Sequence, residues 1–217
     1  MRRTRVMLEI LLACISLLVC SCGQLQTELV RSNDASELVL ADIADQNNIA
    51  TVDVSEDVDL ALGAFAHAFS KVPDAKLIQH FGESKDVKAY YRKLLADEDV
   101  GPFHEGKLRW VRAYMQKKLV AFMSIEPNYH GPHRVYVSTL AVDPAFQGMG
   151  VGRSLLDSIK KKWFPDTQEI VLIVRKINDR AIGFYTKFGF APAPEIDTPL
   201  LGPTENCQWM RWRADAG

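Results

Sequence analysis

The sequence predicts an α/β (α+β) protein whose central mixed sheet has about six to seven strands and is flanked by helices. Two strand-like runs, Lys107 to Met115 and Leu119 to Ile125, are separated by three polar residues, which is typical of an antiparallel hairpin. A third run, Arg134 to Val142, is followed by a helix, a strand and another helix. Such alternation indicates a βαβ crossover with parallel strands. The sheet is therefore expected to be antiparallel in its first half, followed by a pair of parallel strands.

The other elements follow from apolar periodicity and from turn residues. Ile49 to Val54 alternates apolar and polar residues, which predicts a strand. Ser55 is a suitable N-cap for a helix that runs to about Phe69, and Asp86 to Leu95 repeats apolar residues at helical spacing. The later elements are expected as a helix from Val151 to Trp163, a strand from Ile170 to Val174, a helix from Arg180 to Phe188 and a last strand from Cys207 to Arg213.

Length and composition restrict the class of protein. The 217 residues are 47% hydrophobic and 24% charged, which fits one globular domain with a short additional segment and excludes a wholly disordered chain. The formal charge is -1, so the protein as a whole lacks the positive field that attracts nucleic acid. Cysteines are few outside the N-terminal segment, and neither a CxxC pair nor an HExxH helix is present. Neither a disulfide framework nor a metal site is expected.

Residues 1–22 have the pattern of a secretory signal. Three arginines within the first five residues precede an apolar run from Ile10 to Cys20, which is about half the length of a membrane-spanning helix. The sequence Val19-Cys20-Ser21-Cys22 resembles a bacterial lipoprotein box, in which Cys22 would carry the lipid. The sequence thus predicts a membrane-associated or exported protein. The alternatives are an uncleaved anchor that leaves the domain facing the cytoplasm and a true start at Met7.

Residues 23–47 are expected to form a polar tether between this signal and the folded domain. The segment from Gln24 to Gln46 is rich in Gln, Asn, Asp, Ser and Glu and has only scattered Leu and Val, so it has little to bury. Residues 48–217 then form the globular domain.

A glycine-rich loop joins the strand that ends near Val142 to the helix that starts near Val151. It reads Gln147-Gly148-Met149-Gly150-Val151-Gly152-Arg153. Glycine lets the backbone turn tightly and present N–H groups to an anion, while the helix dipole adds positive potential. The loop differs from the dinucleotide fingerprint and from the Walker pattern, because Arg153 stands where those motifs need a glycine or a lysine. It therefore predicts a pyrophosphate site of another kind.

The pattern Q-x-x-G-x-G resembles motif A of the GNAT acetyltransferases, in which the strand, the loop and the following helix hold coenzyme A. The preceding Leu140-Ala141-Val142-Asp143-Pro144 matches the family pattern, as do the following Asn178, Ala181, Phe184, Tyr185 and Phe188-Gly189-Phe190. The resemblance is strong from Arg134 to about Phe190 and extends to the hairpin only as general topology. It implies a GNAT fold with parallel strands splayed at the cofactor site. It also implies acetyl transfer from acetyl-CoA to a primary amine, with no metal.

The resemblance assigns the cofactor to one set of residues, namely Leu140, Ala141, Val142, Gln147, Gly148, Met149, Gly150, Val151, Gly152, Arg153, Asn178 and Tyr185. Leu140 and Val142 would offer backbone groups to the pantetheine arm. Asn178 would bond the pantetheine amides, or it caps the helix from Asp179.

Two residues are expected to be catalytic. The Tyr185 phenol would protonate the departing thiolate, unless it is only a packing residue. Glu126, at the end of a strand, is the expected general base for the attacking amine, with His130, His133 and Tyr136 as alternatives.

The leading interpretation is an N-acetyltransferase that acts on a primary amine of a small molecule or of a protein. The sequence specifies neither the acceptor nor the oligomeric state. An alternative is a membrane-anchored, catalytically inactive binding module with the GNAT fold, because an exported enzyme would meet little acetyl-CoA, which is a cytoplasmic metabolite.

Overall fold

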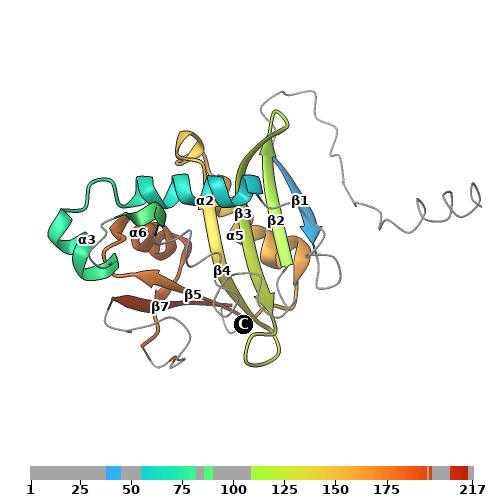
Figure 1. Ribbon diagram of the computed structural model, residues 1–217. Helices are drawn as coiled ribbons and strands as arrows, with labels where there is room; N and C mark the ends of the chain where they lie inside the picture. Colours follow the sequence, from blue (N-terminus) through green and yellow to red (C-terminus); the bar gives the residue numbers. More distant parts are fainter. Residues whose placement is uncertain are drawn as a thin grey trace, which may run out of the picture.

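The protein has a seven-stranded mixed sheet with helices on both faces, as the sequence predicted (Figure 1). The computed structural model describes residues 38–44, 55–81, 86–89, 109–194, 196 and 206–214. In chain order the elements are β1 (Leu38–Ala44), α2 (Ser55–Ala68), α3 (Asp74–Phe81), β2 (Arg109–Met115), β3 (Lys118–Pro127), β4 (Arg134–Val142), α5 (Val151–Ser158), β5 (Glu169–Arg175), α6 (Asp179–Phe188), β6 (Ala191–Pro192) and β7 (Cys207–Arg213). A π-helical turn, Ile159–Trp163, extends α5.

The sheet order is β1-β2-β3-β4-β5-β7-β6. Strands β1 to β4 form an antiparallel meander, β4 and β5 pair in parallel, and β7 pairs antiparallel with β5. This arrangement confirms the mixed sheet and its one parallel crossover, which runs through α5.

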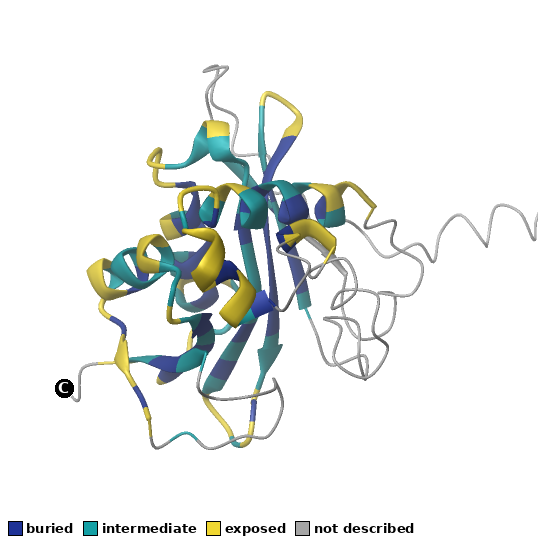
Figure 2. Cartoon of the chain, turned by 60° about the vertical axis from the view of Figure 1, so that its left-hand side comes forward, coloured by how far each residue is buried: buried dark blue, intermediate teal, exposed yellow. Residues whose placement is uncertain are grey.

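The helices divide the core into two layers. On one face, α5 and α6 cover a large apolar cluster that includes Leu155, Leu156, Ile170 and Leu172. On the other face, α2 packs alanines against the aromatic side chains of β2 and β3. In Figure 2 the strands are mostly buried, whereas the outward sides of the helices are exposed. The sheet is thus covered on both faces, which explains why its central strands are continuous apolar runs.

The elements expected from Ser55 to about Phe69 and from Arg134 onward are confirmed, most within one or two residues of the predicted limits. Three elements were not expected: β1, α3 and the two-residue strand β6. Strand β1 lies inside the segment interpreted as a tether, and it pairs antiparallel with β2 from Leu38 to Ala44. The tether interpretation is therefore wrong for these residues, because Leu38 and Leu40 pack against the core.

Several predictions concern residues outside the described part. They are the strand expected at 49–54, the signal expected at 1–22 and the part of the tether that precedes residue 38. Of the helix at 86–95, residues 87–89 are helical. Within the described residues, every helix is too short or too polar to cross a bilayer.

A buried ion pair joins α2 to the sheet. The Asp57 carboxylate, in the first turn of α2, is fully buried and accepts hydrogen bonds from Trp110 Nε1 at 3.1 Å and from Arg112 Nε at 3.0 Å. The Trp110 ring in turn stacks on Phe122 with 4.9 Å between ring centroids. Because both partners lie on β2, this carboxylate fixes where α2 crosses the strands.

We expect Asp57→Ala to lower the free energy of unfolding by about 3–5 kcal/mol, because the change leaves the Arg112 guanidinium nearly buried without its counter-ion. Urea denaturation measures the effect. The control is Asp157→Ala, which breaks a surface pair with Lys161 and should cost less than about 1 kcal/mol. Equal losses in the two variants would show that the buried pair does not anchor α2.

Candidate active site

Strands β4 and β5 separate halfway along their length. Their parallel register covers four pairs, from Arg134 opposite Glu169 to Val137 opposite Leu172. The register between β3 and β4 shifts at the next residue, where Ser138 is the extra residue of a bulge. A bulge bends its strand and increases its twist. Beyond it, β4 continues along β3 while β5 continues along β7 (Figure 1).

A cavity of about 1000 Å³ occupies the gap between the two strands. Side chains from both faces of the sheet line it: Leu172 and Val174 belong to the core under α5 and α6, whereas Tyr136 and Ile173 belong to a cluster on the other face. The cavity therefore passes through the sheet instead of lying on one face of it.

The glycine-rich loop borders one side of this cavity. Gly148 and Gly150 have φ angles of 84° and 86°, in the left-handed region that favours glycine, and a Cβ added to either would meet nothing within 4 Å. Gly150 is the N-cap of α5, so the loop ends where the first N–H groups of the helix are not used within the helix. Space and donors for an anion are thus present together.

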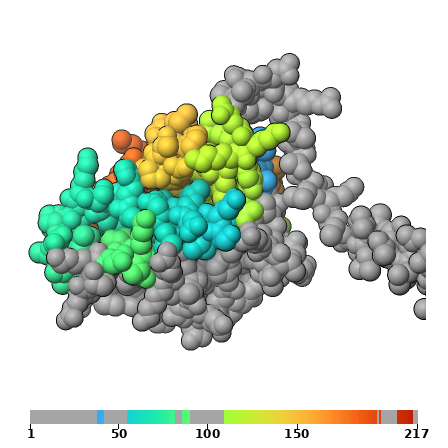
Figure 3. All heavy atoms as spheres, turned by 45° about the horizontal axis from the view of Figure 1, so that its top comes forward, coloured from blue at the N-terminus to red at the C-terminus, as the bar shows by residue number. Residues whose placement is uncertain are grey.

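Two polar side chains hold the loop in place. Asp143 Oδ1 accepts a hydrogen bond from the N–H of Ala145, and its Oδ2 accepts one from Lys118 at 3.0 Å. This backbone N–H, helped by Lys118, lowers the pKa of Asp143 despite partial burial. Gln147 Nε2 donates to the carbonyl oxygen of Val142, and its buried Oε1 has no hydrogen-bond partner among the described residues. In Figure 3 the loop lies beside α2 at the molecular surface.

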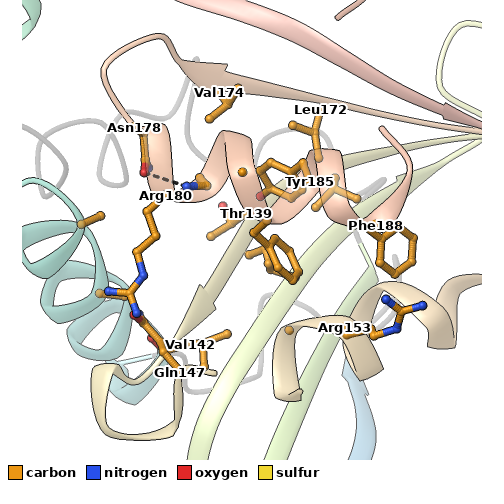
Figure 4. A pocket seen from close by; sticks show the side chains of 18 of the residues that line it. Thr139, Val142, Gln147, Arg153, Leu172, Val174, Asn178, Arg180, Tyr185 and Phe188 are labelled. Atoms are coloured by element: carbon orange, nitrogen blue, oxygen red, sulfur yellow. Dashed lines mark hydrogen bonds between the residues drawn. The ribbon is translucent and has the colours of Figure 1, made fainter. Parts of the chain in front are cut away.

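Helix α6 closes the other side of the cavity. Asn178 caps it, because its Oδ1 accepts from the N–H of Ala181 at 3.1 Å, while the residue also lines the cavity. The Tyr185 side chain points into the cavity, near Thr139 of β4 (Figure 4). Tyr185 is 9% exposed, and burial raises the pKa of its phenol, so the phenol keeps its proton at any physiological pH.

Most of the predicted site residues line this one cavity: Leu140, Val142, Gln147, Gly148, Gly150, Val151, Gly152, Arg153, Asn178 and Tyr185. Two others do not. The Ala141 side chain is buried against α2, and Met149 is 60% exposed. The residues on either side of each, Leu140 and Val142 and then Gly148 and Gly150, do line it.

The predicted bases lie at the end of the sheet remote from the glycine loop. Glu126 stands directly opposite Tyr136 on the neighbouring strand, and Tyr136 rather than Glu126 lines the cavity. Burial raises the pKa of the Tyr136 phenol, with smaller contributions from Tyr129 and Glu126. His130 and His133 lie in the loop between β3 and β4, away from the cavity lining.

The sequence did not indicate the part of the lining that comes from distant segments. Phe65 and Ala68 of α2 and Cys207 of β7 line the cavity, as do Arg175, Arg180 and Lys187. An arginine at the end of a strand and small residues on a helix carry no local signal of a site. A signal for the three cations was present in the sequence, because all of them lie at the end of β5 or on the helix that follows it.

We expect Gly152→Val to lower the free energy of unfolding by about 1–3 kcal/mol. An added Cβ lies only 3.3 Å from Phe184 Cζ and 3.5 Å from Val142 Cγ2, so the larger side chain would push α5 away from α6 and β4. Thermal unfolding measures the loss. The control is Gly63→Ala in α2, where no atom lies within 4 Å and a gain of about 0.5–1 kcal/mol is expected. An unchanged stability of Gly152→Val would contradict this close packing.

Two curated relatives share part of the sequence. An uncharacterized protein of Mycobacterium leprae (strain TN) is 40% identical over 82 residues, which are 37% of this chain and 22% of that protein. N-alpha-acetyltransferase RimI of Mycobacterium tuberculosis is 41% identical over 59 residues, which are 27% of this chain and 36% of that protein. The chain therefore matches less than two thirds of the length of either relative.

Solved structures share the fold over a longer stretch. The PaiA N-acetyltransferase from Thermoplasma acidophilum, solved in complex with coenzyme A, superposes with a TM-score of 0.50 at 14% identity. The match covers 82% of this chain and 99% of that chain. At this identity the likeness concerns the fold alone. The model of the Acetyltransferase (GNAT) family matches residues 76–190, more than half of the chain. Because this match includes the separating strands, the glycine-rich loop and α6, the chain belongs to the GNAT acetyltransferase family.

Proposed function

We propose that this protein is an N-acetyltransferase that transfers the acetyl group of acetyl-CoA to a primary amine. The observation that carries the proposal is the cavity between β4 and β5, where the glycine-rich loop, the open edge of β4 and the Tyr185 phenol meet. Family membership supports acyl transfer, and the two named relatives that are N-acetyltransferases support an amine acceptor.

The residues present fit coenzyme A. Gly148 and Gly150 leave room for a diphosphate against the N-terminus of α5, and the cavity offers the cations Arg153 and Lys187 on the same face. From Ser138 to Val142, no strand of the described residues pairs with the β5 side of β4, so its backbone groups can bond an extended pantetheine arm as a further strand would. The donor, when bound, supplies the activated thioester.

The transfer needs one proton removed and one supplied. The amine nitrogen attacks the thioester carbonyl carbon, the carbon–sulfur bond breaks, and the nitrogen loses a proton to a base. The sulfur leaves as a thiolate, and Tyr185 can protonate it, because a buried phenol with a raised pKa still carries its proton at neutral pH. A backbone N–H near Leu140 would stabilise the carbonyl oxygen.

We infer that Glu126 removes the amine proton through intermediate groups. Tyr136 stands between Glu126 and the cavity, and Tyr136 and Ser138 both line the cavity. A hydrogen-bonded chain of hydroxyl groups or a water molecule can pass a proton to a carboxylate that does not reach the amine itself. The geometry thus favours Glu126 as a final proton acceptor over direct contact with the substrate.

We expect Gly150→Glu to abolish measurable binding of acetyl-CoA by the full chain in calorimetric titration. The side chain would strain a left-handed residue and put negative charge where the diphosphate belongs. The matched control is Gly131→Glu, which introduces the same charge at another glycine of positive φ, in the loop between β3 and β4. This control should bind normally. Normal binding by Gly150→Glu would exclude the loop as the diphosphate site, and failure of the native protein to bind would remove the proposed function.

We expect Tyr185→Phe to bind acetyl-CoA normally and to lower kcat by about 100-fold or more, since the ring remains but the proton donor is lost. Release of free coenzyme A thiol measures the turnover. Tyr114→Phe on β2, which removes a hydroxyl outside the cavity lining, should keep the native rate. If Tyr185→Phe also keeps the native rate, Tyr185 serves only to pack α6.

A further inference from the structure

The cavity continues beyond the gap onto the face of the sheet that carries α2 and α3. We call this part the α2-side compartment; it is lined by Phe65, Ala68, Tyr136, Ile173, Arg175 and Cys207. Four of these side chains are aromatic or aliphatic. The guanidinium of Arg175 is the one full positive charge among these six. The compartment therefore combines apolar walls with a single strong anion-binding group.

Contacts with α3 and β7 fix the position of Arg175. Its Nη1 donates to the carbonyl oxygen of His80 at 3.0 Å, and its Cζ lies 4.4 Å from the centroid of the Phe81 ring. Cys207 stands directly opposite it on β7, so both side chains lie on the same face of the sheet. A guanidinium held in this way is already ordered before a ligand arrives, which reduces the entropy lost on binding.

Positive charge gathers around Arg175. The pKa of His80 is lowered, first by burial and then by Arg175, Lys76 and Lys176, so the imidazole is neutral at physiological pH. Arg175 and Lys176 also act on the Cys207 thiol, although burial raises its pKa overall. Three cations thus act on His80, and two of them, Arg175 and Lys176, also act on Cys207, which lines the compartment. A cavity wall of one sign attracts small ions of the other sign.

Other cations of the cavity are placed for the phosphates of the donor. Arg153 and Lys187 lie on α5 and α6, which cover the opposite face of the sheet, and Arg153 stands beside Phe188 in Figure 4, away from Asn178. Arg175 lies instead against α3, on the far side of the gap. Its charge is therefore placed for the acceptor and not for the diphosphate.

We propose that Arg175 binds the carboxylate of the acceptor and that the acceptor is a free amino acid with an apolar side chain. This inference rests on the proposed function and names its substrate class. Phe65 and Ile173 would contact the side chain, and the carboxylate at Arg175 would leave the amine free to face the gap. A positive neighbourhood also lowers the pKa of an ammonium group, which favours the neutral amine that attacks the thioester.

The test compares two acceptors with acetyl-CoA and the full chain. L-phenylalanine carries a carboxylate, and L-phenylalaninamide carries an uncharged amide in its place. We expect kcat/KM to be at least about tenfold higher for the acid, the size of a charge-assisted hydrogen bond. This preference would hold although the amide has the larger fraction of neutral amine. Arg175→Gln should raise KM for phenylalanine about 10- to 100-fold with little change for the amide, and Arg175→Lys should recover part of the loss.

Two controls separate binding from folding. Lys161→Gln removes an exposed lysine remote from the cavity and should leave all constants unchanged. Because Arg175 also contacts α3, the melting temperature and the acetyl-CoA affinity of Arg175→Gln are measured, and both should stay close to native values. Arg175→Lys keeps the proposal testable if the glutamine variant unfolds.

The possible results are distinct. Equal kcat/KM for the acid and the amide, an undiminished preference in Arg175→Gln, or binding of acetyl-CoA without transfer to either acceptor would overturn the proposal. If acetyl-CoA does not bind, the proposed function fails. The carboxylate site is then decided by calorimetry with N-acetylphenylalanine and its amide. Tighter binding of the acid, lost in Arg175→Gln, supports the site, and equal binding rejects it.

Discussion

The separation of β4 from β5 is the constraint on which the site depends. Strands in a sheet normally satisfy each other's backbone groups, and a buried N–H or C=O without a partner is costly. Here the parallel pairing ends after Val137, next to the bulge at Ser138. The two halves of the sheet then follow different neighbours, β3 on one side and β7 on the other. The fold thereby keeps one strand edge open in its interior, next to a cavity.

The surrounding layers keep this gap from collapsing. Helices α5 and α6 pack on one face around a common apolar cluster, and α2 is held to the other face through Asp57. Gly152 lets α5 approach α6 closely, with Phe184 between them. Tyr185 belongs to the same cluster and also lines the cavity. Its ring packs in the core under α6, while its hydroxyl is the group proposed to donate a proton. Packing and proposed chemistry therefore share one side chain.

The half of the site that local sequence encodes could be predicted. Glycine spacing between a strand and a helix reports a backbone conformation directly, and six of the seven residues from 147 to 153 line the cavity. Strand β1 was missed because polar residues surround it and its partner, β2, lies far along the chain. The lining by Phe65, Arg175 and Cys207 could not be predicted, since it depends on how α2, α3 and β7 pack in three dimensions. The relation between Glu126 and Tyr136 required the register of β3 and β4.

In the proposed function, the passage through the sheet would also separate the two substrates by face. The glycine-rich loop, Arg153 and Lys187 belong to the side of α5 and α6, whereas Arg175 and the apolar walls belong to the side of α2 and α3. Each face carries its own positive charge, so an anionic donor and an anionic acceptor can bind without competing for the same cation. In this proposal their reactive groups would meet where β4 and β5 separate, which is where Tyr136 and Tyr185 line the cavity from opposite faces. The transfer would then be confined to the gap.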